Sequence, residues 1–415
     1  MSKHTNKAKD VDRDSITTEV THVQDWNGGS LHRIGGVDMV VLNGTYKEMG
    51  RQYGHLAKDK MIAALAGWKK IFIESGVLDF ESIHEVIGGP FFTSAPKFRK
   101  DLYTGMAETS GLSLEEVVVL DNWLFLALLG RRAGCSSYVA WGSKTIDGTA
   151  YMGRNLDFPD WARDLIASTG VIAVMNPVGG DFGVAGFGIG GTVTAFDDMM
   201  NSEGLYVSFN NGVGSIGPVT YSNRFDMISY MGWMLRQYST IEELKVVFNS
   251  VRSNYPGLMG VSQPDRGVHF EMSPETYAAN VTNDGGEYSL RANQFEDPSW
   301  GIPVLTGKTA WYSYTRTQAW LKALELNGAD KIDETVLMEI MTRPMFNDDG
   351  TLTGTGWTVF EPPAKDPTAG DGGEGGDVNM YQVITHSAER IWWLRIPTYT
   401  GWLKIDFKKY FKDKS

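Results

Sequence analysis

Hydrophobic residues are spaced mostly as in helices before Gly134, and the spacing changes at Gly134 to the alternation of strands. Residues 37–44 predict a short strand, and residues 45–76 then place apolar side chains at the spacing of a long helix. Ser113 and Glu116 have the spacing of a capping box, which predicts the start of a second helix. The segment before Gly134 is therefore predicted to be mostly helical.

Beyond Gly134 the pattern is typical of strands. Residues 138–158 alternate, are rich in β-branched and aromatic side chains, and carry Asp147-Gly148 where a tight turn would lie. A hairpin is therefore predicted directly after the single cysteine. Further strands are predicted at 171–178, 204–211, 257–263, 267–273, 276–283, 380–386 and 390–397, and helices at 226–238, 240–251, 313–328 and 333–343.

Two segments lack either period. Residues 1–30 are polar and aperiodic, which predicts a loose leader. Residues 366–377 are too rich in glycine for regular structure and predict a surface loop. The acids of this loop lack the spacing of an EF-hand, so it does not match a calcium loop of that kind.

Composition and charge exclude several classes of protein. With 42% hydrophobic residues, the 415-residue chain can bury a sizeable core, and its net charge of -12 argues against nucleic acid as a partner. The most apolar run, residues 117–129, is too short for a membrane span. The N-terminus has no apolar signal region and one cysteine allows no internal disulfide, so we expect a cytoplasmic protein.

The glycine pattern GFGIGG, residues 186–191, matches a dinucleotide-binding fingerprint. The residues that follow it, TVTAFDDMM, are β-branched and do not predict the helix that such a site needs. A glycine-rich turn between strands is the better interpretation. We therefore expect no nucleotide cofactor.

Cys135 is the candidate with the most specific surroundings. A single cysteine is by default a small buried hydrophobe. Here Gly134 precedes it and can adopt strained geometry, a strand follows it where a papain-type cysteine would begin a helix, and Arg154 and Asp157 come just after the predicted hairpin turn. These features indicate a nucleophile.

The order of these motifs resembles that of the N-terminal-nucleophile (Ntn) hydrolases acting on linear amides, the group of penicillin V acylase, bile salt hydrolase and acyl-coenzyme A:6-aminopenicillanic acid acyltransferase. In that family the cysteine, exposed as a new N-terminus, precedes an R-N-x-D motif, matched by Arg154, Asn155 and Asp157. The other matches are Met200, Asn201, Gly204, Leu205 and Asn211, then Asn293, then Ser313 and Arg316, and upstream Gly44 to Gly54. The long segment before Cys135 makes the self-cleaving, acyltransferase-like branch the nearer relative.

The resemblance implies an α+β fold, a four-layer αββα sandwich with a mostly helical N-terminal segment. It divides the chain into a leader (1–30), an alpha-chain segment (31–134) and a catalytic beta-chain core (135–415), the last two packing as one domain. It also implies a zymogen in which the thiol cleaves the Gly134-Cys135 bond and frees the α-amine of Cys135 as a built-in base. The chemistry calls for no metal or organic cofactor, and a homo-oligomer is compatible with it.

The resemblance also implies roles around the thiol. Arg154 would favour the thiolate, and Asp157 would hold the new α-amine. Asn211 would be the first oxyanion donor and Asn293 the second, with Arg316 orienting the polar groups. The substrate would be a small N-acylated molecule with an apolar acyl group, passed from a thioester to water or to an amine.

Alternatives remain at this stage. A one-residue shift in register would exchange Asn211 for Asn210. His269 lies 134 residues after Cys135, within the spacing of a papain-like peptidase. A non-catalytic ligand-binding relative of the same fold would keep Cys135 buried and the bond before it intact. Four tryptophans are candidates for an apolar acyl pocket, namely Trp161, Trp311, Trp392 and Trp393.

Overall fold

The computed structural model describes residues 12, 14–75, 80–83, 85, 88–122, 134–158, 160–212, 227–251, 253–274, 280–282, 286–296, 311–342 and 378–412. The glycine-rich loop predicted at 366–377 lies outside these residues. No helix in the described ranges combines the length and apolarity that a membrane crossing requires.

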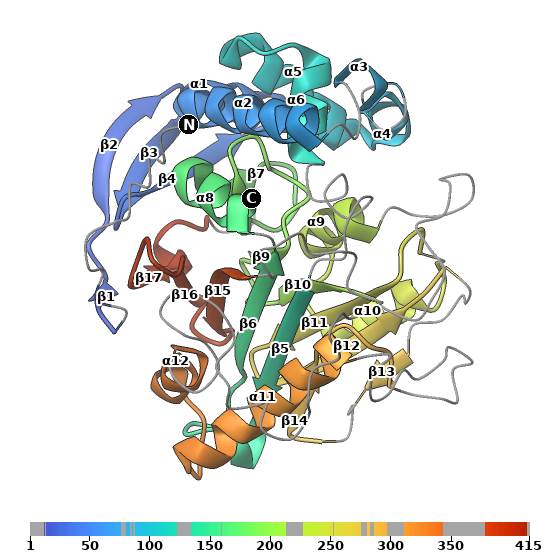
Figure 1. Cartoon of the computed structure of the whole chain (residues 1–415). Coiled ribbons are helices and arrows are strands. Elements are labelled where there is room, and N and C mark those ends of the chain that lie inside the picture. Colours follow the sequence, from blue (N-terminus) through green and yellow to red (C-terminus); the bar gives the residue numbers. More distant parts are fainter. Residues whose placement is uncertain are drawn as a thin grey trace.

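Two sheets form the centre of the described part of the molecule (Figure 1). The smaller, which we call sheet A, has the strand order β1 (Ile16–Thr17), β17 (Trp402–Asp406), β16 (Ile391–Arg395), β15 (Val378–His386), β6 (Tyr151–Phe158), β5 (Gly134–Ala140) and β14 (Tyr288–Arg291). The larger, sheet B, has the order β13 (Asn280–Thr282), β12 (Arg266–Met272), β11 (Gly257–Gln263), β10 (Tyr206–Asn211), β9 (Asp198–Asn201), β8 (Val184–Ile189), β7 (Gly170–Pro177), β4 (Val37–Gly44), β3 (Gly29–Ile34) and β2 (Thr21–Trp26).

The N-terminal helices are α1 (Tyr46–Leu56), α2 (Lys58–Ser75), α3 (Phe80–Ile83), α4 (Gly89–Ser94), α5 (Lys97–Ser110) and α6 (Leu114–Asp121). Those that follow β5 are α8 (Asp160–Thr169), α9 (Met227–Gln237), α10 (Ile241–Phe248), α11 (Trp311–Asn327) and α12 (Glu334–Thr342), with short 3-10 turns η2 (Gly142–Lys144) and η6 (Phe407–Lys409).

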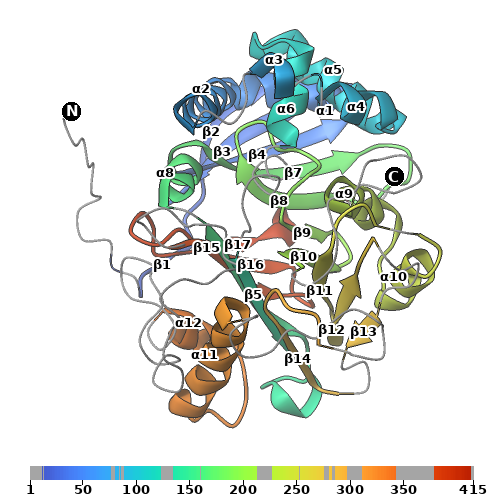
Figure 2. The same ribbon diagram turned by 45° about the vertical axis from the view of Figure 1, so that its right-hand side comes forward.

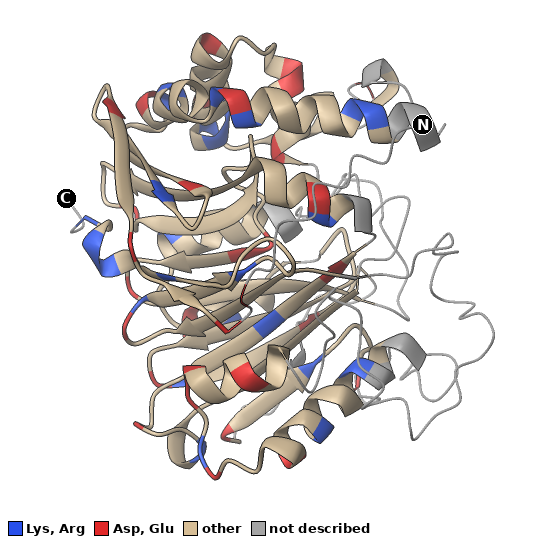
Figure 3. Cartoon of the chain, turned by 60° about the vertical axis from the view of Figure 1, so that its left-hand side comes forward, with Lys and Arg blue, Asp and Glu red and all other residues tan. Residues whose placement is uncertain are grey.

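The layers follow from which elements touch. Strand β5 of sheet A packs against β10, β11 and β12 of sheet B, so the two sheets lie face to face. Helices α11 and α12 cover the other face of sheet A, whereas α1, α9 and α10 contact sheet B (Figure 2). The four-layer αββα arrangement expected from the sequence is confirmed. In the view of Figure 3, acidic and basic residues are interspersed along the outer helices.

The prediction of a loose leader over residues 1–30 is wrong for its second half. Strands β2 and β3 form a hairpin whose turn, Asn27-Gly28, has positive φ at both residues (52° and 88°). The whole of β2 is exposed or half-buried because it forms the edge of sheet B, so its sequence lacks the alternation of a half-buried strand. The Asn-Gly turn was the available signal.

The segment before Gly134, which was predicted to be mostly helical, also contributes strands to both sheets. Strand β4 pairs in parallel with β7 in the interior of sheet B, and β1 pairs in parallel with β17 at the edge of sheet A. The helix predicted at 45–76 is divided at Ala57 into α1 and α2. The capping box predicted at Ser113 and Glu116 is confirmed.

Two glycine predictions need correction. Residues 186–189 of the GFGIGG run lie within strand β8, and only the last two glycines form a turn. The glycine at position 186 leaves room for the side chain of Phe196, which packs where a Cβ would lie. The next described element is strand β9, so the strand–turn–helix order of the dinucleotide fingerprint does not occur at this run. Gly134 begins strand β5 and is not among the described glycines with positive φ, so backbone strain is not observed there.

A buried carboxylate ties the N-terminal helices to sheet B. Asp121, the last residue of α6, is fully buried and accepts hydrogen bonds from the backbone N–H groups of Val193 (2.6 Å) and Thr194 (2.9 Å). It also accepts from the Tyr103 hydroxyl (2.7 Å) and forms an ion pair with Arg99 (3.2 Å). The loop that these bonds hold runs directly into β9.

Asp121→Asn should therefore destabilise the fold strongly. It removes the carboxylate that pairs with the buried Arg99, and breaking a buried ion pair typically costs about 3–5 kcal/mol. Burial alone would raise the pKa of Asp121, but Arg99 and the hydrogen bonds outweigh it and lower the pKa. This stabilisation is complete above the unfolded carboxyl pKa of about 3.9 and is lost as pH falls through the folded value. Urea unfolding at several pH values measures both effects, and the exposed Asp59→Asn should change stability by less than about 0.5 kcal/mol.

Candidate active site

The hairpin of β5 and β6 places different side chains on the two faces of sheet A. Cys135 pairs with Leu156 in register, and side chains alternate along each strand. Cys135 and Arg154 face sheet B, where Arg154 reaches the Phe209 carbonyl oxygen. Asp157 belongs to the opposite set, which faces α11. The motif R-N-x-D therefore sends its arginine and its aspartate to opposite sides of the same strand.

The sulfur of Cys135 is buried and lies beside a cation. The residue is 2% exposed, and Nη2 of Arg154 donates to Sγ at 3.4 Å. Burial raises the pKa of the thiol to about 12, although Arg154 acts in the opposite direction. The thiol therefore carries its proton at neutral pH.

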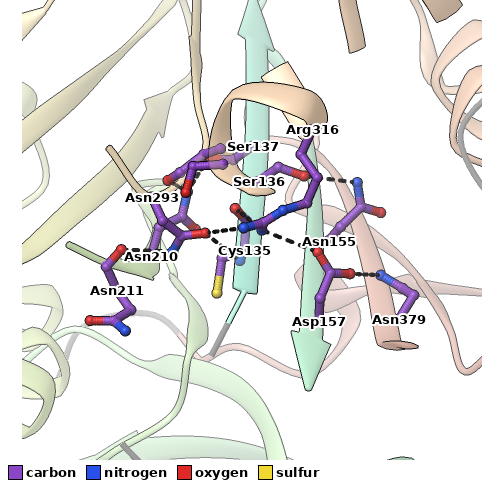
Figure 4. Close-up of polar contacts among 12 residues, drawn as sticks. Cys135, Ser136, Ser137, Asn155, Asp157, Asn210, Asn211, Asn293, Arg316 and Asn379 are labelled. Carbon is purple, nitrogen blue, oxygen red and sulfur yellow. Dashed lines mark hydrogen bonds and ion pairs between the residues drawn. The ribbon is translucent and has the colours of Figure 1, made fainter. Parts of the chain in front are cut away.

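The backbone of Cys135 is held by two residues from distant parts of the sequence. Its N–H donates to Oδ1 of Asn293 (2.9 Å), and its carbonyl oxygen accepts from Nη1 of Arg316 (2.6 Å). Arg316 also donates to Oδ1 of Asn293 (2.6 Å) and forms an ion pair with Asp157 (3.3 Å), to which Asn379 donates at 3.0 Å. Figure 4 shows these groups converging on the start of β5.

The two adjacent asparagines at the end of β10 differ in their surroundings. The amide of Asn210 donates to Ser137 Oγ (3.2 Å) and to the Ala292 carbonyl (3.2 Å), so its N–H groups are engaged. The backbone carbonyl oxygen of Asn211 accepts from the side-chain amide of Asn293 (2.7 Å). The side chain of Asn211 itself forms no hydrogen bond with the described residues. In Figure 4 the Asn211 amide lies on the side of the site toward which Sγ points. Of the two, Asn211 therefore has the amide available for a ligand.

Arg154 joins the sulfur to a pair of acids on sheet B. Its Nη1 donates to Oδ2 of Asp198 (2.8 Å), and its Nη2 lies 3.3 Å from Oδ2 of Asp197. Asp198 also accepts hydrogen bonds from the hydroxyls of Tyr206 and Tyr381. All of these groups are buried between the two sheets.

Sequence reasoning missed several of these residues. Asp197 and Asp198 stand in the run TAFDDMM, where apolar residues flank two acids on both sides. Charges in such a run predict buried groups that need partners, which was the available signal. Asn379 had no comparable signal, because its contact with Asp157 joins residues 222 positions apart.

His269 does not contact the sulfur. Its Nε2 is bonded to Ser137 Oγ and its Nδ1 to Ser289 Oγ, both at 2.8 Å, in the middle of β12. Burial lowers its pKa well below the usual value, so the imidazole is neutral. Cys135 also begins a strand and not a helix. The geometry therefore does not support a papain-like pair of Cys135 and His269.

The tryptophans proposed for an acyl pocket belong in part to the core. Trp392 packs edge-on against Tyr206 and Phe407. Trp393 is buried in the cluster between sheet A and α11 and α12. The side chains of Trp161 and Trp311 lie outside the described set.

Comparisons of sequence give no relative for this chain. No protein-family model matches it, and no curated protein matches it. Among the described residues no group of three or more potential metal ligands occurs.

Comparison of structures finds partial similarity to several solved structures. A mutant of the conjugated bile acid hydrolase from Clostridium perfringens is 16% identical, with a TM-score of 0.44 over 66% of this chain and 93% of that chain. Penicillin V acylase from Agrobacterium tumefaciens is 13% identical (TM-score 0.42; 66% and 87%), and the Caenorhabditis elegans ortholog of N-acylethanolamine-hydrolyzing acid amidase is 15% identical (0.37; 61% and 93%). At these values, assignment of a function depends on the geometry around Cys135.

Proposed function

We propose that the protein is a cysteine-dependent Ntn amidohydrolase that cleaves its own Gly134-Cys135 bond and then cleaves linear amides of small N-acylated molecules. One observation carries the proposal. Cys135 lies at the start of β5 with its sulfur beside Arg154 and its backbone nitrogen on Asn293. A buried cysteine that serves only as core needs an acceptor for its backbone N–H but no arginine beside its sulfur.

Cleavage would change the chemistry of that nitrogen. In the intact chain it is an amide N–H, but after cleavage it is an α-amine whose reference pKa of about 7.7–8.0 allows it to be neutral near physiological pH. The amine can then take the thiol proton of its own residue directly or through water. Asn293 already accepts from this nitrogen, and Arg316 holds Asn293 and Asp157 around it.

Acyl transfer would follow on the sulfur. The thiolate attacks the substrate carbonyl, the amine leaves with a proton from the α-ammonium, and water or an amine acceptor then attacks the thioester. Arg154 favours the thiolate by charge, and Asn211 presents an amide toward the developing oxyanion. The proposal covers hydrolysis and transfer alike, since both use the same thioester.

Asn211→Ala should lower kcat by roughly 10²–10³-fold, the usual effect of removing one oxyanion donor. KM should change much less, because the donor acts mainly on the transition state. The neighbouring Asn210→Ala should instead lower stability by about 1–3 kcal/mol, since it removes the buried donor of Ser137 and Ala292. Steady-state kinetics and urea unfolding of both variants separate the two. If Asn211→Ala keeps wild-type kcat, the assigned role is wrong.

A trapped thioester tests the proposed reaction. The purified protein is mixed with N-acyl amino acids, penicillin V, conjugated bile salts and N-acyl ethanolamines, quenched in acid, and examined by intact mass. We expect one of these to be hydrolysed and to leave an acyl group on the chain that starts at Cys135, removable by hydroxylamine. Burial of Cys135 favours a second candidate, a ligand-binding protein with an intact chain. That protein would bind such compounds without turnover and without an adduct.

A further inference from the structure

The first cleavage needs a proton acceptor that the mature enzyme does not. Before cleavage the nitrogen of Cys135 is an amide and cannot act as a base. The thiol is buried, and burial raises its pKa to about 12. A group close to the sulfur must therefore take its proton before it can attack the Gly134 carbonyl.

Two adjacent carboxyl groups lie near the sulfur in contrasting surroundings. Asp198 accepts hydrogen bonds from Arg154, Tyr206 and Tyr381, which stabilise its charged form. Both side-chain oxygens of Asp197 are buried and have no hydrogen-bond donor among the described residues, and Arg154 forms an ion pair with Oδ2 at 3.3 Å. Two carboxyls whose surroundings differ in this way typically divide into a permanent charge and a proton carrier.

We propose that Asp197 accepts the thiol proton of Cys135 in the intact chain and so starts the cleavage of the Gly134-Cys135 bond. This inference rests on the proposed function, because it assigns a base to the self-cleavage. Nη2 of Arg154 contacts both Sγ of Cys135 (3.4 Å) and Oδ2 of Asp197 (3.3 Å). Transfer of the proton therefore moves one negative charge from one neighbour of this nitrogen to the other.

The step balances with water as the only co-reactant. The thiol proton moves to the Asp197 carboxylate, and the sulfur attacks the Gly134 carbonyl carbon. The bond from that carbon to the Cys135 nitrogen breaks, the nitrogen takes the proton from Asp197, and a thioester joins Gly134 to the sulfur. Water then hydrolyses the thioester, which leaves a carboxyl group on Gly134 and a free thiol and α-amine on Cys135.

The position of Asp197 is fixed by the backbone. Its carbonyl oxygen accepts from the Phe209 N–H at 3.0 Å, which holds the residue at the start of β9. The charged and titratable groups that act on it are Arg154 from β6, Cys135 from β5, its neighbour Asp198 and Tyr381 from β15. Burial raises the pKa of Asp197 to about 7 against the opposing charge of Arg154, so the carboxyl can both take and release a proton near neutral pH.

The test follows self-cleavage of the full chain as a function of pH. The protein is made by cell-free translation with a short radioactive pulse and chased from about pH 5.5 to about pH 8.5, and loss of the intact band is timed. A base must be ionised to act, so the wild-type rate should rise with pH and level off above about pH 7. Asp197→Asn should cleave about 10²–10⁴-fold more slowly and lose this dependence, and Asp197→Glu should restore it.

Asp198→Asn is the matched control, because it alters the neighbouring acid and the same arginine but leaves the proton acceptor in place. Its cleavage should keep an inflection, moved below pH 7 because the charge of Asp198 raises the pKa of Asp197. A wild-type rate that does not change over the range, or a folded Asp197→Asn that keeps the inflection, would overturn the role of Asp197. The proposed function would survive either result as long as the wild-type chain is cleaved and Cys135→Ala is not.

Discussion

Cys135→Ala should stay a single chain of 415 residues and should have no amidase activity. The side chain of Cys135 supplies the nucleophile for both reactions in this account, and the chain has no second thiol. The variant should change the stability of the fold little, because alanine leaves the backbone hydrogen bonds to Asn293 and Arg316 in place. A denaturing gel, which resolves residues 1–134 from 135–415, and an amide hydrolysis assay measure the two effects.

Ser136→Ala is the control for this variant. Ser136 is the next residue of β5, but it faces α11 and accepts from Trp320 Nε1 at 3.0 Å. Its replacement should cost about 1–3 kcal/mol by leaving a buried donor unsatisfied, while the chain is still cleaved. Cleavage that persists in Cys135→Ala would show that the thiol is not its own processing agent.

Arg154→Met should combine a large loss of stability with a large loss of cleavage. The variant leaves Asp198 buried between the sheets without its cation, and breaking a buried pair in this way typically costs about 3–5 kcal/mol. It also removes the cation that opposes the effect of burial on the pKa of the thiol. We therefore expect self-cleavage to slow by at least about 10²-fold. Urea unfolding and the gel assay measure the two effects.

A double variant separates the two roles of Arg154. In Arg154→Met with Asp198→Asn both charges are gone, so much of the lost stability should return while cleavage remains slow. Recovery of cleavage together with stability would mean that Arg154 acts only on the fold. The hydroxyls of Tyr206 and Tyr381 can still donate to the side-chain oxygen of asparagine at position 198.

Helices and strands could be predicted where the spacing of hydrophobic residues along the sequence reflects which side chains are buried. Strands β11 and β12 and helices α9 and α10 lie close to the predicted ranges. The strands are short runs buried on both faces, and the helices pack an apolar face on the core. The edge strand β2 was not predicted, because both of its faces are largely exposed and its sequence shows no alternation. The parallel pairing of β4 with β7 could not be predicted, since a pattern along one strand does not specify its neighbour in space.

In the candidate site, too, local groupings could be predicted from the sequence and contacts between distant segments could not. Cys135, Arg154 and Asp157 share one hairpin, so their grouping followed from the register around the predicted turn. Asn293 and Arg316 were assigned only by resemblance, and the structure does bring both to the backbone of Cys135. The choice between Asn210 and Asn211 depends on which amide is already engaged, and that is a property of the packed sheets.

The N-terminus of the mature protein tests the central claim most directly. Intact mass and terminal sequencing of purified, active material should find a chain that begins at Cys135 with a free α-amine, together with the segment that ends at Gly134. Active material in which Cys135 is still joined through its nitrogen to Gly134 would contradict the account.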